Sequence, residues 1–176
     1  MIENEFTFLV KKLPKDLKRY PKKRIRQGYF SDLPSPLRIR DEDGEYTLTK
    51  KFIIKEDDFS RYNEIVLPIK KEEFERLWPV CKKTLTKTRY YYPLSNGLKA
   101  EIDIYHKKLK GLVTVEVEFP SEEARKKFRP PDWFGLDITQ KDWSNNLILA
   151  GLTYREVKKL IDKEINVRKK KVYEKK

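Results

Sequence analysis

Stretches in which apolar residues alternate with charged ones fill the first two thirds of this chain, and they restrict it to a fold built mainly from strands. In residues 2–10, Phe6 and Phe8 lie on one face of an extended backbone, and Glu3 and Glu5 lie on the other. Asp-Gly, Asn-Gly and Lys-Gly pairs separate several of these stretches and favour hairpin turns, so neighbouring strands are expected to run antiparallel. We predict further strands over residues 37–40, 46–54, 62–68, 87–93, 99–105 and 112–119.

Helical patterns are fewer and shorter than the strands. Residues 70–82 carry apolar side chains at helical spacing, and a shorter helix is predicted from Ser121 to just before Pro130. Thr153 and Glu156 form a capping box that begins a C-terminal helix. The chain contains no repeat or linker, so residues 1–176 are expected to form one domain with a basic helical tail from about residue 153. About eight antiparallel strands with a few helices predict the α+β class.

The charge balance limits the classes of molecule that this chain is expected to bind. It carries 41 Lys and Arg against 28 Asp and Glu, a formal net charge of +13, which suits nucleic acid, an anionic membrane surface or a phosphate-rich small molecule. Two basic blocks, residues 11–26 and 168–176, lack the periodic aromatic side chains of a base-stacking surface, so we favour a solvated surface over nucleic-acid binding. The longest stretch without charge, residues 143–154, is too short to cross a bilayer, and a cytoplasmic location is expected.

Charges of one sign recur two residues apart, so both members of each pair point to the same side of a strand, about 7 Å apart. If these faces line one cavity, the crowded carboxylates need a divalent cation, and their all-oxygen ligand set favours Mg²⁺ or Mn²⁺. Basic pairs in the same cavity would suit phosphate oxygens. The alternative is that acidic and basic pairs face each other as cross-strand salt bridges. The pairs are Glu3/Glu5, Arg38/Arg40, Lys87/Arg89, Glu101/Asp103 and Glu116/Glu118.

The order of these motifs resembles that of the CYTH superfamily, the triphosphate tunnel metalloenzymes. The similarity extends to about residue 150, and it includes Gln27-Gly28-Tyr29, which resembles the family's Gln-Gly-Tyr strand. The other matching motifs are Glu3-x-Glu5, Leu37-Arg38-Ile39-Arg40, Leu48-Thr49-x-Lys51, Lys87-Thr88-Arg89-Tyr90, Glu101-Ile102-Asp103, Glu116-Val117-Glu118-Phe119-Pro120-Ser121-Glu122-Glu123, and the segment from Trp133-Phe134-Gly135 to Ser144-Asn145-Asn146.

This resemblance implies an eight-stranded antiparallel β-barrel tunnel with flanking helices, which binds triphosphate compounds together with a divalent metal. Two positions depart from the family pattern: Thr7 replaces the Lys of Glu-x-Glu-x-Lys, and Glu64 is the one inward Glu expected before Pro68. The phosphate-binding residues implied are Arg38, Arg40, Lys51, Lys87 and Arg89, and the metal-side carboxylates are Glu3, Glu5, Glu64, Glu101, Asp103, Glu116 and Glu118.

The activity expected from the resemblance is metal-dependent hydrolysis of a triphosphate by in-line attack of water on the terminal phosphoryl group. Glu5 or Glu118 would position the water, and Lys87 belongs to the basic wall that stabilises the developing charge. Inorganic tripolyphosphate is the favoured substrate, because the sequence contains no motif for binding a base. Three alternatives remain open: a class IV-type adenylate cyclase, a thiamine triphosphatase, and a non-catalytic protein that binds polyphosphate or RNA. Either a monomer or a homodimer is expected.

Overall fold

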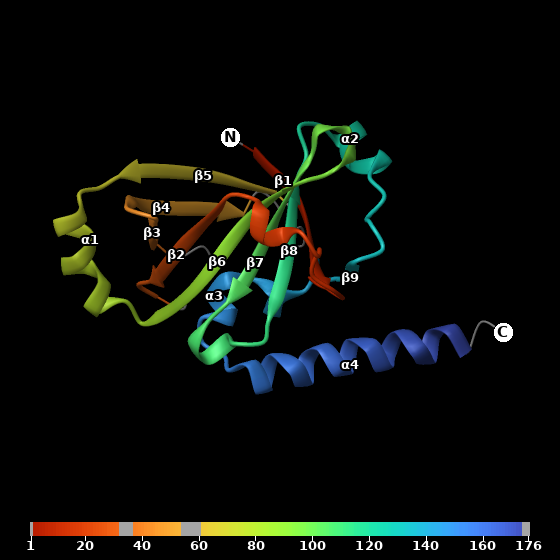
Figure 1. The fold of residues 1–176 in the computed structure, drawn as a ribbon. Coiled ribbons are helices and arrows are strands. Elements are labelled where there is room, and N and C mark those ends of the chain that lie inside the picture. Colours follow the sequence, from red (N-terminus) through yellow and green to blue (C-terminus); the bar gives the residue numbers. More distant parts are fainter. Residues whose placement is uncertain (1, 32–36, 54–60, 174–176) are drawn as a thin grey trace.

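The computed structural model describes residues 2–31, 37–53 and 61–173, and the side chains of Glu3 and Lys51 lie outside the described part. Its strands form one antiparallel sheet in the order β5-β4-β3-β2-β6-β7-β8-β1-β9 (Figure 1). The α+β class is therefore confirmed, although this part of the chain contains nine strands. They are β1 (Ile2–Val10), β2 (Lys22–Tyr29), β3 (Leu37–Glu42), β4 (Glu45–Ile53), β5 (Arg61–Pro68), β6 (Lys83–Pro93), β7 (Lys99–Tyr105), β8 (Val113–Glu118) and β9 (Phe134–Asp137).

Strand β1 joins the two ends of the sheet. One of its edges pairs with β8 over residues 5–9, and the other edge is divided between two strands. Residues 2–4 pair with β5, whereas Phe8 and Val10 pair with β9. The expected tunnel-like fold, a ring of strands, is confirmed, and it differs from the expected eight-stranded barrel in two details: β5 and β1 meet over three described residue pairs only, and β9 is an additional strand.

Short helices connect and cover the strands. The helix predicted over residues 70–82 is divided into α1 (Lys71–Leu77) and a 3₁₀ turn η2 (Trp78–Val80), because Pro79 has no N–H with which to continue the α-helix. No helix in the described part is long and apolar enough to cross a membrane. The remaining helices are α2 (Glu122–Lys127), α3 (Asn146–Leu149) and α4 (Tyr154–Tyr173), with 3₁₀ turns η1 (Leu17–Arg19), η3 (Ser95–Gly97), η4 (Lys107–Leu109) and η5 (Asp142–Ser144).

The outer face of the sheet carries one of the two apolar cores. Ile102 and Val115 belong to this cluster, and Leu17 of η1, Phe128 and Phe134 of β9 pack over it. This arrangement follows from the alternation along the strands, because positions on one side are apolar and are covered by peripheral segments. The other side of the same strands, which carries the charged positions, therefore faces the interior of the ring.

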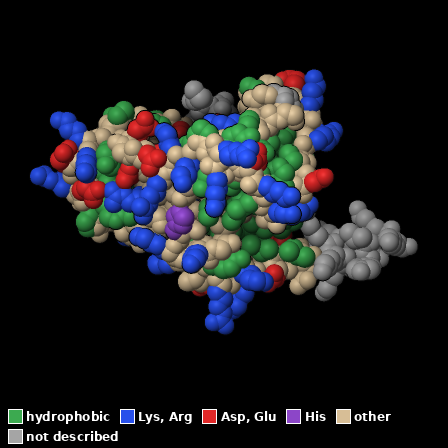
Figure 2. Space-filling view, in the orientation of Figure 1, with side chains coloured by type: hydrophobic (Ala, Val, Ile, Leu, Met, Phe, Trp, Pro, Cys, Tyr) green, Lys and Arg blue, Asp and Glu red, His purple; other side chains and the backbone are tan. Residues whose placement is uncertain are grey.

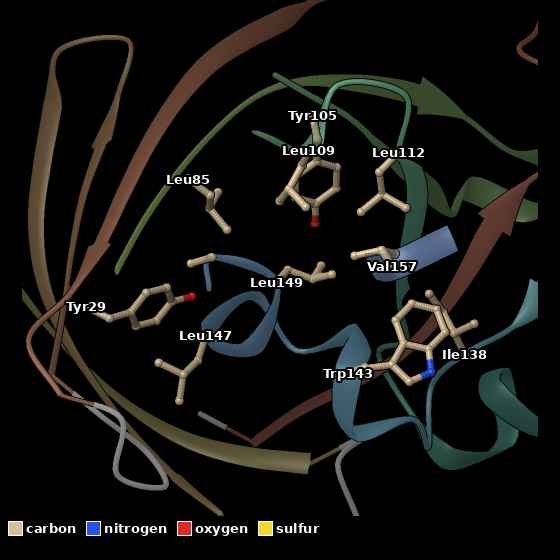
Figure 3. Packing of buried hydrophobic residues seen from close by; sticks show 11 residues of the cluster. Tyr29, Leu85, Tyr105, Leu109, Leu112, Ile138, Trp143, Leu147, Leu149 and Val157 are labelled. Atoms are coloured by element: carbon tan, nitrogen blue, oxygen red, sulfur yellow. The ribbon is translucent and has the colours of Figure 1, made fainter. Parts of the chain in front are cut away.

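A second apolar core fills one end of this interior. Tyr29, Leu85 and Tyr105 point inward from β2, β6 and β7, and they pack against Leu147 and Leu149 of α3 (Figure 3). Residues of η5 and α4 complete this cluster. We call it the apolar plug, and define it as Tyr29, Leu85, Tyr105, Leu109, Leu112, Ile138, Trp143, Leu147, Leu149, Ala150 and Val157.

Candidate functional site

The strand register places the charged pairs on the same face of the sheet. Glu5 lies opposite Glu118, and Glu116 lies opposite both Thr7 and Glu101 on its two neighbouring strands. Since paired residues in an antiparallel ladder point to the same side, this face is continuous around the ring. Further cross-strand pairs on this face are Arg89 with Asp103, Gln27 with Arg40, and Arg38 with Thr49. The backbone register also pairs Lys51 with Glu64 and Glu3 with Tyr62.

Arg89 is the centre of the buried charge network. Its Nε atom donates to Asp103 Oδ1 at 2.7 Å and its Nη2 atom to Oδ2 at 2.6 Å, a bidentate pair. Arg89 also forms ion pairs with Glu101 and Glu116. The Lys87 ammonium reaches Asp103 Oδ2 at 2.5 Å. Two cations and three carboxylates are thus paired inside the ring, as the salt-bridge alternative from the sequence expects.

The two oxygens of Asp103 are both occupied by cations. Burial alone would raise the pKa of this carboxyl, but Arg89 and Lys87 outweigh burial and hold the pKa well below its usual range. Burial lowers the pKa of Lys87, and Asp103 opposes that change. Both side chains of this pair are fully buried. Asp103 therefore acts here as the counter-ion of the two cations.

Arg38 and Arg40 form a less neutralised wall on β3. Arg38 Nη2 donates to Glu64 Oε1 at 2.8 Å, whereas Arg40 Nη1 lies 3.6 Å from Glu42 Oε2. Burial, together with the nearby charges of Arg38 and Arg89, lowers the pKa of Arg40 to about 10, so the guanidinium keeps its charge at neutral pH. The Nε atoms of Arg38 and Arg40 are buried and have no hydrogen-bond partner among the described residues.

A cavity of about 120 Å³ lies beside this arginine wall. Its lining combines cationic, acidic and hydroxyl side chains on the inner face of three neighbouring strands, β3, β4 and β5. Buried donors without partners next to an open space are the condition in which an anionic ligand gains most from binding. The lining residues are Arg38, Arg40, Glu42, Glu45, Thr47, Thr49, Glu64 and Val66.

The carboxylates of β1 and β8 are chemically suitable ligands for a hard divalent cation. Glu5 and Glu118 lie directly opposite each other, where like charges repel unless a cation or another partner compensates them. Both have further interactions with other groups. The described residues contain no group of three or more His, Cys, Asp or Glu side chains that would hold a metal ion. Carboxylate oxygens are present among the described residues, but these oxygens are not gathered around one point.

Several interior residues were not among the site residues predicted from the sequence. Gln27, Thr49 and Thr114 are buried on the inner face, and each has a side-chain oxygen without a hydrogen-bond partner among the described residues. The signal that would have found them is their spacing, because Thr49 precedes Lys51 by two positions and Thr114 precedes Glu116 by two. The Tyr91 hydroxyl donates to Glu42, which lines the cavity, at 2.6 Å.

The basic block of residues 11–26 lies mostly outside the ring. Lys and Arg side chains are spread over the surface seen in Figure 2, where tan and green side chains separate them. Arg26 is partly covered, because it stacks on Phe74 and Trp78. The exposed members of the block are Lys11, Lys12, Lys15, Lys18, Arg19, Lys22 and Arg24. The candidate site is therefore the interior of the ring.

Comparison with known proteins identifies the family of this chain. The sequence is 38% identical over 154 residues to the inorganic triphosphatase of Nitrosomonas europaea, an alignment that covers 85% of this chain and 97% of that protein. This chain belongs to the CYTH superfamily. A second inorganic triphosphatase, from Acetivibrio thermocellus, is 34% identical to this CYTH chain over 116 residues, which are 65% of the chain and 71% of that protein. No family model matches the sequence.

Solved structures agree with the CYTH assignment. The crystal structure of an inorganic triphosphatase matches with a TM-score of 0.65 and 35% identity, and covers 84% of this chain and 93% of that one. A Hippeastrum protein, described as a candidate adenylyl cyclase with a dominant triphosphatase activity, matches with a TM-score of 0.51 at 18% identity over 71% of this chain and 82% of that one. This second likeness concerns the fold alone.

Proposed function

We propose that this chain hydrolyses triphosphate compounds, with inorganic tripolyphosphate as substrate and Mg²⁺ or Mn²⁺ as cofactor. The observation that carries the proposal is the arginine wall: Arg38 and Arg40 border a cavity, and their buried Nε atoms have no partner among the described residues. A phosphate chain supplies the oxygens that these donors lack. The inorganic triphosphatase of Nitrosomonas europaea, aligned over most of this chain, supports the same substrate class.

The phosphate groups would be bound by cations from three strands, β3, β4 and β6. Arg38 and Arg40 would make the first contacts, because they are the less neutralised pair and they border the cavity. Arg89 and Lys87 would follow as their carboxylate partners are displaced or shared. Lys51, opposite Glu64 in the β4–β5 ladder, would add a fifth cation. Guanidinium groups suit this task because their planar donors match the spacing of phosphate oxygens.

The metal would be held by carboxylates of β1 and β8, namely Glu3, Glu5, Glu116 and Glu118. Their oxygens are the ligands that Mg²⁺ and Mn²⁺ favour, and Glu5 opposite Glu118 is a position that gains from a cation. When bound, the metal would supply charge neutralisation for the phosphate oxygens. Glu64, Glu101 and Asp103 lie outside β1 and β8 and contact Arg38, Arg89 and Lys87, so we assign them to positioning these cations.

The reaction consumes one water and yields pyrophosphate and orthophosphate. The water oxygen bonds to the terminal phosphorus while the bridging P–O bond breaks, and the electron pair stays on the leaving pyrophosphate. Glu5 or Glu118 accepts the proton of the water. Arg40, Arg89 and Lys87 stabilise the negative charge that develops on the phosphoryl oxygens and on the leaving group. Oriented charges of this kind account for most of the rate acceleration in phosphoryl transfer, since no covalent intermediate is needed.

A phosphate-release assay tests this proposal. Tripolyphosphate, ATP and thiamine triphosphate are compared with Mg²⁺, with Mn²⁺ and with a chelator. We expect fast release of orthophosphate from tripolyphosphate that the chelator abolishes. Cyclic AMP and pyrophosphate from ATP would assign a cyclase instead, and fastest turnover of thiamine triphosphate would assign a thiamine triphosphatase. Tight binding of these compounds without turnover would indicate a non-catalytic polyphosphate-binding protein.

Arg40→Ala is the variant that connects the assay to the arginine wall. We expect it to reduce kcat/KM for tripolyphosphate at least 100-fold, because a charged donor in a partly desolvated site is removed. Arg155→Ala is the matched control, since Arg155 is exposed on α4 and the change in net charge is the same. Equal activity of the two variants would show that the arginine wall does not bind the substrate.

A further inference from the structure

On the outside of the ring, the fold brings aromatic side chains to the basic block of residues 11–26. Tyr20, at the end of η1, contacts Tyr92 of β6 with the ring centres 4.7 Å apart. Tyr92 in turn contacts Trp133, whose ring centre is 5.8 Å away, and the Trp133 carbonyl accepts the backbone N–H of Lys11 at 2.9 Å. We call these three rings the aromatic row. It adjoins the basic block at both ends, although its members are widely separated in sequence.

The aromatic row is held in place and is still partly open to solvent. Its three side chains are half-buried. Tyr92 and Trp133 pack against the outer apolar core, and the hydroxyls of Tyr20 and Tyr92 both donate to Asp16, at 3.2 and 3.4 Å. Rings that are fixed in this way lose little conformational freedom when a planar ligand stacks on them, so more of the contact energy appears as affinity.

Exposed cations lie next to these rings. Lys18 and Arg19 directly precede Tyr20, and both are exposed. The Lys22 ammonium, also exposed, lies 5.8 Å from the ring centre of Tyr90 on β6. Figure 2 views the molecule from the side of η1, and on this face blue cationic side chains lie among green hydrophobic ones, while red acidic side chains gather at the end that carries α1. The surface therefore combines positive charge with partly exposed aromatic rings.

We propose that this outer surface binds single-stranded nucleic acid, with bases stacked on the aromatic row and phosphates beside the exposed cations. Only a ligand with both anionic groups and planar rings uses both features. Polyphosphate and an anionic membrane lack the rings, and in a duplex the base faces are already stacked on each other. The surface lies outside the ring, so the inference is independent of the proposed function. The cations assigned to phosphate contacts are Lys11, Lys18, Arg19 and Lys22.

Fluorescence anisotropy of a short labelled oligouridylate, with the full chain and a chelator, tests the proposal. We expect binding that weakens about 50-fold between 50 and 200 mM salt, as four phosphate contacts to a single strand predict. Linear polyphosphate of equal charge should compete at least about fivefold less well than unlabelled oligouridylate, because it gains no stacking. Equal competition by polyphosphate would overturn the proposal. So would the absence of binding, including the case in which the chain binds phosphatidylserine vesicles instead.

Tyr20→Leu separates stacking from charge. Leucine keeps an apolar side chain at this position but offers no ring, so we expect oligouridylate to bind at least about fivefold more weakly. Binding of polyphosphate should not change, because the net charge is the same. A melting temperature close to that of the wild type shows that the variant is folded. Unchanged binding of oligouridylate, or an equal loss for both ligands, would contradict stacking on the aromatic row.

Arg19→Ala and Arg155→Ala form a matched pair for the charge contribution. Both arginines are exposed, and both substitutions remove one positive charge, but Arg19 lies beside the aromatic row and Arg155 lies on α4. We expect Arg19→Ala to weaken binding and to reduce the slope of log K against log salt by about 0.7, whereas Arg155→Ala changes neither. Arg40→Ala reports on the interior of the ring: a loss there and none in Arg19→Ala would place the strand inside the ring and overturn the proposal.

Discussion

At the scale of single residues, the interior is stable because its charges compensate each other. Lys87 and Asp103 are fully buried, and neither would remain charged there alone, since isolated ions in an apolar interior have a high free energy. Arg89 shares its donors among three carboxylates, which satisfies its guanidinium without water. The buried cations of the ring are thus compensated by acids of neighbouring strands.

Asp103→Asn tests this compensation. We expect the free energy of unfolding to fall by about 3 kcal/mol. The substitution removes one of the negative charges that compensate Lys87 and Arg89 in a buried network. Asp162→Asn is the control, since the Lys158–Asp162 pair is 3.0 Å long but exposed, and its loss should matter by less than about 1 kcal/mol. Urea denaturation followed by tryptophan fluorescence measures both values. Equal effects would mean that the buried network adds no stability.

Acid should weaken the fold through the same carboxyl. The pKa of Asp103 is lower in the folded chain than its ordinary value of about 3.9, because Arg89 and Lys87 outweigh the effect of burial. A lowered pKa gives stability that is complete above the unfolded value and is lost as the pH falls through the folded value. Below about pH 4, we expect the urea concentration at the unfolding midpoint to fall more steeply with decreasing pH in the wild type than in Asp103→Asn. Parallel profiles would assign the acid sensitivity to other groups.

At the scale of elements, the short helix α3 closes the ring although it is only four residues long. Leu149 is fully buried in the apolar plug, while its neighbour Ile148 is 38% exposed. The Asn145 side chain accepts from Leu147 N at 2.8 Å and begins the helix, and Asn146 accepts from the Tyr105 hydroxyl at 2.8 Å. These contacts fix the leucines inside the ring of strands.

Leu149→Ala should therefore be far more destabilising than Ile148→Ala. We expect a loss of about 3 kcal/mol for the buried leucine, from lost burial and from the cavity left behind. Less than about 1 kcal/mol is expected for the exposed isoleucine. Thermal and urea unfolding of the two purified variants provide the comparison. Similar losses would show that α3 packs against the body through a different face.

The strands were largely predictable from sequence, and the plug was not. Alternation identified β1 almost to the residue, because each inward charge has an outward apolar neighbour. It placed the start of β6 at Lys87, whereas the strand begins at Lys83, since Thr84, Leu85 and Thr86 do not alternate charge with apolar side chains. Segments η5 and α3 are too short for a helical period to be visible. Which acids pair with which cations depends on register, which sequence spacing does not define.

At the scale of the whole molecule, the proposed binding of a polyanion by this chain of net charge +13 would be a source of stability. Any ligand that binds only the folded chain raises its free energy of unfolding, by about 2.7 kcal/mol at a concentration one hundred times Kd. We expect tripolyphosphate with Mg²⁺ to raise the melting temperature, and added salt to reduce this shift by screening. Scanning fluorimetry measures both effects. A shift of the same size in Arg40→Ala would place the binding outside the arginine wall.

The pairing of β1 also affects how the chain folds. Its first residues pair with β5, its middle with β8, and its end with β9, so the N-terminal strand finds its last partner only once residue 137 is available. Contacts between such distant segments slow folding, because a large loop must be closed before they form. During synthesis on the ribosome, β1 leaves first and remains unpaired longest. Its row of Phe6, Phe8 and Val10 is then an exposed apolar stretch on an unpaired strand, a combination that promotes aggregation until its partners are available.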